Sequence, residues 1–333
     1  MIAVGILANP AAARDVRRLV ARASTVTIAE RCTMIQRALV GLWKMGVGRV
    51  LMMADQGGIA AGLERAKKHQ RRDVPLGWPQ LEFLDMRVIG GASDTLEAVT
   101  MMRNQDCKVI IVLGGDGTHR LVSHACGDIP LVCISTGTNN VFPEFLESTV
   151  AGIAAGALAM GKVTRESVCL RNKRLLLHVN GVEEIPALVD ICVTNEDWIG
   201  TRALWRPEDM RELYLAFAEP GAIGLSSIGS LLQPKGREAA EGLQIRMGAS
   251  LNGGKSIEAP IAPGLIAAVN VKSCHPLLLG KPQLVSVSRG TVALDGEKEI
   301  EFCPEDRVEV TLDSRGPWSV NVPKVMGRLA KSS

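Results

Sequence analysis

Hydrophobic residues in the first half of the chain follow two alternating patterns. Short apolar runs, typical of buried strands, cover residues 3–8, 49–54, 81–86, 109–113 and 130–135. Apolar residues at helical spacing predict helices over residues 14–23, 29–45, 59–70, 94–104 and 146–160. Ser93 is the expected N-cap of the fourth helix. Strands that alternate with helices predict an α/β domain with an open, mostly parallel sheet.

The pattern changes after about residue 163, where helical periodicity fades and short alternating runs favour a mostly β, sandwich-like domain. The predicted strands cover residues 167–171, 174–180, 186–193, 244–248, 265–271, 284–288, 291–294, 300–302, 307–312 and 318–322. A single helix is predicted over residues 208–217. We therefore expect an α/β domain at 1–163, a β-rich domain at 164–322 and a basic tail at 323–333.

Composition narrows the classes of function. A chain of 333 residues is long enough for two domains with sizeable cores. A net charge of +3 and an aromatic content of 3% argue against nucleic acid and a membrane surface as partners. The eight cysteines are scattered without a C-x-x-C pair, which favours reduced thiols over a disulfide frame or a zinc site. No apolar stretch approaches about 18 residues, so we expect a cytoplasmic protein without a membrane anchor.

The stretch with the clearest chemistry is Lys108–Thr118, KVIIVLGGDGT. Its apolar strand ends at Gly114 and Gly115, where a bare main chain allows a ligand to approach closely. A helix that follows would add its positive N-terminal end, which favours phosphate. A lone acid beside a phosphate repels it, so Asp116 would hold Mg²⁺ or accept a proton. The alternative is a tight turn with a capping aspartate.

Further segments follow the order of a known superfamily. They are ANP at 8–10, TGTNNVF at 136–142, the pair Asn195–Glu196 and ALDGE at 293–297. With GGDGT they resemble the superfamily of NAD kinases and diacylglycerol kinases, over roughly residues 1–322. Within this superfamily, TGTNN combined with NEDWIGTRALW is most similar to the acetoin-catabolism protein X group, described as ATP-NAD kinase-like.

This resemblance implies an NAD kinase-like fold and an ATP-dependent kinase. Asp116 would act as the general base or as a metal contact in phosphoryl transfer. The implied nucleotide-binding residues are Asn9, Gly114, Gly115, Gly117, Thr118, Thr136, Gly137, Thr138, Asn139, Asn140, Asn195 and Glu196. ATP would be the donor, Mg²⁺ would bridge its phosphates, and NAD would be the substrate. The resemblance also implies a homo-oligomer.

The TGTNNVF segment departs from both branches of the superfamily. Lipid kinases carry Gly at the position of Asn139 and Asp at the position of Val141, and the added amide narrows the pocket. Three functions therefore stay open. The chain is a kinase that converts NAD to NADP, a catalytically weak nucleotide-binding accessory protein of acetoin catabolism, or a kinase for a different small-molecule or lipid acceptor.

Three features near these motifs have simpler structural interpretations. Asn195–Glu196 follows an apolar strand and fits a pair at the end of a hairpin. Asp295–Glu297 fits either a group that orients the tail or a metal, or a type I′ hairpin turn. His119 fits a surface residue at a helix start better than a phosphate contact.

Overall fold

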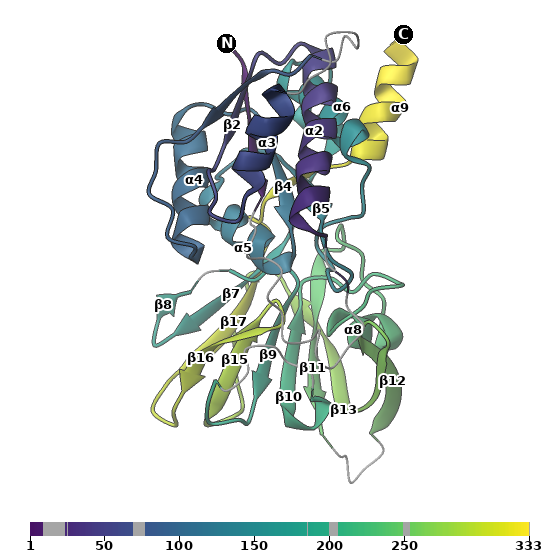
Figure 1. Ribbon diagram of the computed structural model, residues 1–333. Coiled ribbons are helices and arrows are strands. Elements are labelled where there is room, and N and C mark those ends of the chain that lie inside the picture. The colour runs from purple at the N-terminus through teal and green to yellow at the C-terminus, as the bar shows by residue number, and fades with distance from the viewer. Residues whose placement is uncertain are drawn as a thin grey trace.

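The protein consists of two stacked halves (Figure 1). The computed structural model describes residues 1–8, 24, 26–68, 77–184, 186–199, 206–248 and 254–332. The α/β half comprises the described residues of 1–171 and 317–332, and the β-rich half comprises those of 172–316. The predicted helix at 14–23 lies outside the described residues.

The α/β half is built on a seven-stranded sheet with the order β3-β2-β1-β4-β5-β18-β6. Its strands are β1 (Ala3–Ala8), β2 (Arg49–Met52), β3 (Gln80–Phe83), β4 (Ile110–Gly114), β5 (Leu131–Ser135), β6 (Cys169–Arg171) and β18 (Trp318–Val320). All neighbours pair in parallel except β18 and β6. The predicted open, mostly parallel sheet is confirmed, and its central strands are buried on both faces.

Helices cover both faces of this sheet. They are α2 (Ile28–Met45), α3 (Ile59–Lys68), α4 (Ala92–Asn104), α5 (Asp116–Ala125), α6 (Ser148–Ala159), α7 (Arg165–Val168) and α9 (Val322–Ser332). α2, α3, α6 and α9 share one hydrophobic core, whereas α4 and α5 pack in the core on the other face. The sheet's carboxyl edge is left facing the β-rich half (Figure 1).

Two local expectations in the α/β half differ from the structure. Gly91, not Ser93, is the N-cap of α4, because Asp94 turns its carboxylate back to accept from the N–H groups of Ile89 and Gly90. Residues expected in a basic tail form α9, which packs beside α6 through the buried Val325 (Figure 1). The sequence of α9 is strongly amphipathic, but its basic residues hid this pattern in the sequence analysis.

The β-rich half contains two antiparallel sheets. The larger has the order β12-β13-β11-β10-β9-β15-β16, and the smaller has the order β14-β17-β7-β8. Their strands are β7 (Arg174–Val179), β8 (Val182–Glu183), β9 (Asp190–Thr194), β10 (Met210–Leu215), β11 (Glu241–Met247), β12 (Lys255–Ala262), β13 (Leu265–Leu278), β14 (Gln283–Leu284), β15 (Gly290–Leu294), β16 (Glu297–Phe302) and β17 (Val308–Asp313). The inward residues of both sheets share one core, as predicted for a sandwich-like arrangement. Helix α8 (Ser226–Leu232) covers the other face of the larger sheet.

The predicted helix at 208–217 is wrong. A short 3₁₀ turn at Pro207–Asp209 leads into β10, which pairs with β9 on one side and β11 on the other. Within β10, Glu212 is buried and accepts from Tyr214 Oη at 2.5 Å and from the N–H of Ser286. Pairing with two neighbouring strands overrides the local helical preference.

A buried lysine fixes the loop between α8 and β11. Lys173 Nζ donates to the carbonyl oxygens of Ala239 at 2.7 Å and Glu241 at 2.8 Å. Lys173 is only 6% exposed, and burial lowers its pKa to about 8. The loop is thus anchored to the start of β7, at the junction of the two halves.

We expect Lys173→Met to remove part of the pH dependence of stability. Folding lowers the pKa of Lys173 from 10.5 to about 8, so between these values the unfolded state binds more protons. The destabilising contribution of this group is full below pH 8 and fades as the pH rises toward 10.5. Urea unfolding should show wild-type stability rising by about 2–3 kcal/mol over this interval relative to Lys173→Met. Parallel curves for the two proteins would contradict the assignment.

Candidate functional site

The GGDGT turn lies at the carboxyl edge of the parallel sheet. β4 ends at Gly114, and α5 begins at Asp116 with Gly115 as its N-cap. A Cβ added at Gly115 would lie 2.8 Å from Asn140 Oδ1, so a side chain there would collide with the TGTNN loop. Gly115 offers no side-chain cap to the first turn of α5. This helix end therefore keeps the polarity that favours an anion.

Asp116 joins the two motifs that follow neighbouring strands. Its carboxylate accepts from the N–H of Val141 at 3.0 Å and from the N–H of Phe142 at 2.8 Å. The structure therefore brings GGDGT and TGTNNVF together. This is expected of two turns that follow adjacent parallel strands. Backbone N–H donors stabilise the ionised carboxylate and fix its orientation.

The TGTNN loop is shaped largely by its own side chains. Asn140 Nδ2 donates to Ser135 Oγ at 2.8 Å and to the carbonyl of Gly137 at 3.2 Å. Thr138 Oγ1 accepts from the N–H of Ser24 at 3.0 Å. Thr136 is buried, whereas Asn139 is half-buried at the surface of the loop. The loop is thus preorganised at the sheet's edge.

Thr118 has a different place from the residues of the TGTNN loop. It is buried beneath the turn, where its Cβ would lie 2.6 Å from a Cβ added at Gly114. This close packing lets α5 start directly after β4. Unlike the other predicted site residues, Thr118 therefore supports the GGDGT turn by packing against Gly114.

The ALDGE segment forms a two-residue hairpin turn between β15 and β16. Asp295 has φ 49° and Gly296 has φ 81°, so both central residues are left-handed, as a type I′ turn requires. The turn faces the start of α5, because Glu297 Oε1 lies 3.9 Å from the position of a Cβ added at Gly117. A second carboxylate thus lies against the GGDGT turn.

Asp295 also fixes the start of β9. Its carboxylate accepts from the N–H groups of three consecutive residues, at 3.0 Å for Leu188, 2.8 Å for Val189 and 3.2 Å for Asp190. Arg120 Nε on α5 lies 3.9 Å from Asp295 Oδ2, and both side chains are buried. Burial raises the pKa of Asp295, and Arg120 and the three N–H groups oppose this rise. The pair ties α5 to the β-rich half.

His119 is not at the surface as expected. It is fully buried, and its Nδ1 lies 2.8 Å from the carbonyl oxygen of Gly115. Burial lowers the pKa of His119 to about 4, so its ring is neutral near pH 7. The ring lies 6.0 Å from that of Phe142, which places it under the motif as a packing residue. Phe142, its aromatic neighbour, is distant in sequence, so this packing was not visible in the local pattern.

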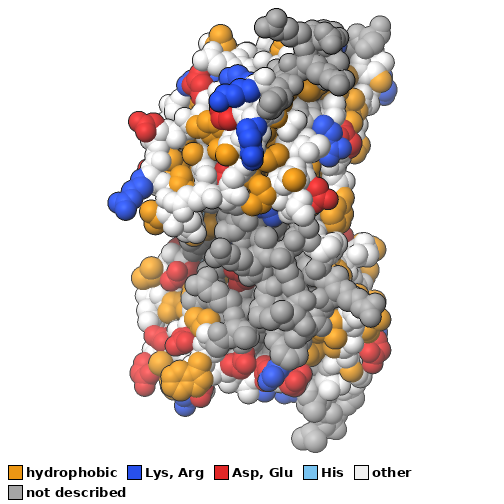
Figure 2. Space-filling model, viewed as in Figure 1, with side chains coloured by type: hydrophobic (Ala, Val, Ile, Leu, Met, Phe, Trp, Pro, Cys, Tyr) orange, Lys and Arg blue, Asp and Glu red, His pale blue; other side chains and the backbone are white. Residues whose placement is uncertain are grey.

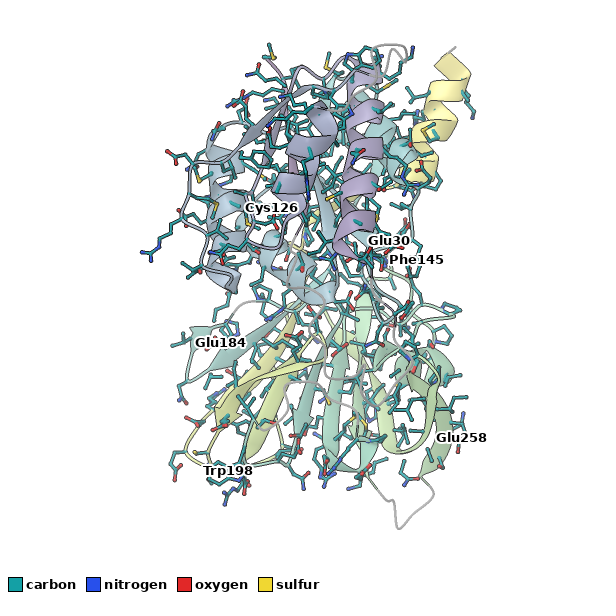
Figure 3. All side chains as sticks on the ribbon, in the orientation of Figure 1. Glu30, Cys126, Phe145, Glu184, Trp198 and Glu258 are labelled. Carbon is teal, nitrogen blue, oxygen red and sulfur yellow. The ribbon has the colours of Figure 1, made fainter. Side chains whose placement is uncertain are left out.

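The structure does not bring Asn195 and Glu196 to the GGDGT turn. β9 and β15 are antiparallel, and Asp295 lies beside Asp190 whereas Thr194 pairs with Thr291. Asn195 and Glu196 therefore follow the opposite end of β9. Trp198, just beyond them, lies at the end of the β-rich half away from the α/β half (Figure 3). Asn9 lies outside the described residues.

Sequence reasoning missed two charged residues of this junction. Arg120 follows Asp116 by one helical turn, and Asp190 is a charged residue within the apolar segment ALVDICVT. Both are buried at the contact between the halves. A charge inside an otherwise apolar strand was the available signal, because such a group needs a partner from elsewhere in the fold.

Metal ligands, membrane-spanning helices and thiols are three further features of the part of the chain that the structure describes. No cluster of three or more metal-ligating side chains occurs there. No helix in it has the length and apolarity needed to cross a bilayer. The eight cysteines, all within that part, are free, and burial raises the pKa of Cys107 and Cys126 to about 12. Hydrophobic, acidic and basic side chains are interspersed on the face shown in Figure 2.

Comparisons with known proteins agree with this division of the chain. Residues 4–163 match the ATP-NAD kinase N-terminal domain, so the α/β half carrying GGDGT is of the NAD kinase type. Residues 173–315 match the C-terminal domain of acetoin catabolism protein X. The acetoin catabolism protein X of Cupriavidus necator is 43% identical over 328 residues, covering 97% of this chain and 91% of that protein. The chain belongs to the acetoin catabolism protein X family.

A solved structure is also similar to this chain. It is that of a putative diacylglycerol kinase from Bacillus anthracis, at 14% identity and a TM-score of 0.44, with 96% of each chain covered.

We expect Asp295→Asn to destabilise the protein by about 3 kcal/mol in urea unfolding. The amide keeps one acceptor oxygen for three backbone N–H groups, and Arg120 loses a buried counter-charge. Asp106→Asn is the matched control, because Asp106 forms an exposed pair with Lys108, and we expect only a small change there. Equal effects of both substitutions would contradict the role of Asp295.

Proposed function

We propose that the GGDGT turn, with the TGTNN loop and the ALDGE hairpin beside it, binds a nucleotide, and that the chain is an ATP-dependent kinase. Its simplest reaction is phosphorylation of the 2′-hydroxyl of NAD to give NADP. The observation that carries this proposal is the joining of GGDGT to TGTNN by Asp116, beside the second carboxylate of Glu297. The match to the ATP-NAD kinase N-terminal domain supports the same reaction class.

Each part of the site has a chemical role in this proposal. Gly115 and Gly117 bring the main chain and the start of α5 to the phosphates. The half-buried part of the TGTNN loop offers neutral donors and acceptors to the nucleotide. Asp116 and Glu297 are the two carboxylates that could take the proton of the attacking hydroxyl. Asp116 is already bound to two N–H groups, which leaves Glu297 as the stronger candidate for the base and Asp116 for positioning or metal contact.

The residues present fit a magnesium-bound triphosphate. Carboxylate oxygens are the ligands that Mg²⁺ prefers, and Asp116 and Glu297 provide them beside an uncapped helix start. Mg²⁺, when bound, offsets the negative charge of the donor phosphates. The protein's own contribution is to position the reactants and to hold the acceptor hydroxyl near a carboxylate.

Asn195 and Glu196 are not part of the proposed site. The length of β9 separates them from α5, so the proposed phosphate contacts on GGDGT do not include them. Their structural interpretation, a pair at the end of a strand, is the one that the geometry favours. Glu196 donates its N–H to Thr194 Oγ1 at 3.2 Å, which closes that strand end.

A second candidate is a nucleotide-binding accessory protein of acetoin catabolism with little or no turnover. It is favoured by the engagement of Asp116 with Val141 and Phe142, which suits a structural carboxylate as well as a reactive one. A third candidate is a kinase for a different small-molecule or lipid acceptor. A cytoplasmic location, expected from the scattered thiols, and a homo-oligomeric state, implied by the family resemblance, also belong to the proposal.

Product analysis with Mg-ATP and NAD tests the proposal. Wild type should form NADP, and Glu297→Gln should lower kcat by about 10²–10⁴-fold while ATP affinity changes little. Asp116→Asn should lose activity and weaken ATP binding together, because it loosens the TGTNN loop. Glu183→Gln, on the exposed strand β8, is the control and should behave as wild type.

Three other outcomes are informative. Tight ATP binding without NADP would move the assignment to the accessory protein or to another acceptor. A Glu297→Gln variant with full activity would exclude Glu297 as the base. A wild type that binds neither ATP nor NAD would contradict the nucleotide site itself.

A further inference from the structure

The loop between α8 and β11 reaches across the junction with one arginine. Arg237 donates from its terminal Nη2 to the carbonyl oxygen of Val141 at 2.9 Å and from Nε to Glu219 at 3.1 Å. Its guanidinium lies 5.2 Å from the ring centroid of Phe142 and 4.5 Å from that of Phe217. The side chain is 12% exposed, so these contacts are largely shielded from water.

The residues that Arg237 contacts in the α/β half are the ones that hold Asp116. The N–H groups of Val141 and Phe142 donate to the Asp116 carboxylate, and the carbonyl of Val141 accepts from Arg237. The Phe142 ring faces the same guanidinium. One short segment therefore contacts both GGDGT and the β-rich half.

The loop that carries Arg237 is itself well anchored. Lys235 pairs through its backbone with Ala218 and forms an ion pair with Glu241. Lys173 binds the carbonyl oxygens of Ala239 and Glu241. Anchors on both sides of Arg237 limit its freedom, so its guanidinium presents a fixed surface to Val141 and Phe142.

We propose that Arg237 is a positioning residue of the nucleotide site, through which the β-rich half sets the orientation of Asp116 and the TGTNN loop. The inference rests on the proposed nucleotide site and adds a determinant of affinity outside the α/β half. Arginine suits the task, because its planar group can stack between two rings while donating in two directions. Lysine would keep the charge but lose the stacking and one of the fixed donor directions.

Hydrogen exchange and ATP titration together test this role. Arg237→Met should speed exchange in peptides covering residues 136–146 by about tenfold and weaken Mg-ATP binding by about tenfold. Arg237→Lys should give a smaller effect in both measurements. Asp116→Asn should loosen the same peptides, and the double variant should fall short of additivity because both residues act on one segment.

Arg171→Met is the matched control. Arg171 also pairs with a carboxylate, Asp128, and stacks on an aromatic ring, Trp318, but at the opposite edge of the sheet. We expect it to lower stability without changing exchange at 136–146 or ATP affinity. A purely structural Arg237 would behave in the same way as this control.

The outcomes separate this inference from the proposed function. Unchanged exchange at 136–146 in both Arg237 variants would overturn the positioning role, whatever the protein binds. Faster exchange with unchanged ATP affinity would overturn the link to the nucleotide. A wild type that binds no ATP would overturn the proposed function, and the exchange measurement would still decide whether Arg237 fixes the loop. If Arg237→Met does not fold, Arg237→Lys and Glu219→Gln provide the same comparison.

Discussion

The carboxylate of Asp116 is the contact on which the geometry of the candidate site depends. It lies at the first residue of α5 and accepts from the backbone of Val141 and Phe142, which belong to the turn after the next strand. The turns that follow two neighbouring strands are thereby joined to each other. Without this carboxylate, the N–H groups of Val141 and Phe142 would lose the acceptor that it provides.

The same device recurs at other turns. Asp295 accepts from three consecutive N–H groups at the start of β9, and Asp94 accepts from two before α4. Asp55 likewise accepts from the first residues of α3. Carboxylates bound to backbone N–H groups are strong and directional, so they fix loops with few residues. The chain uses them where the two halves and their turns must keep a fixed relation.

The alternation of apolar runs and helical segments was enough to predict the parallel sheet, its covering helices and the β-rich second half. These features depend on local periodicity, which a single sequence contains. The helix predicted at 208–217 failed because β10 gains its partners from β9 and β11, which are distant in sequence. His119 was misplaced for a related reason, since it packs beside Phe142, which is distant in sequence.

The site was predictable only in part. GGDGT and TGTNN follow neighbouring strands, so their meeting followed from topology. The pair Asn195–Glu196 resembled a family motif in sequence alone. The direction of β9 places the pair at the end of the strand that is away from the GGDGT turn, and a short motif does not reveal strand direction. Arg237 had no sequence signal, because its importance comes from Phe142 and Phe217, which meet it only in the folded chain.

One feature of the fold bears on how the protein is made. β18, at residues 318–320, pairs with β5 and completes the sheet on which GGDGT and TGTNN are mounted. During synthesis both motifs leave the ribosome long before β18 does, so the start of β5 lacks its neighbouring strand, whereas Glu144 pairs with the later part of β5. Exposed edges of this kind invite aggregation and chaperone binding. The sheet of the α/β half can therefore be completed only after the β-rich half has been synthesised. A fragment that ends at residue 163 would keep both motifs but would lack β18 and β6.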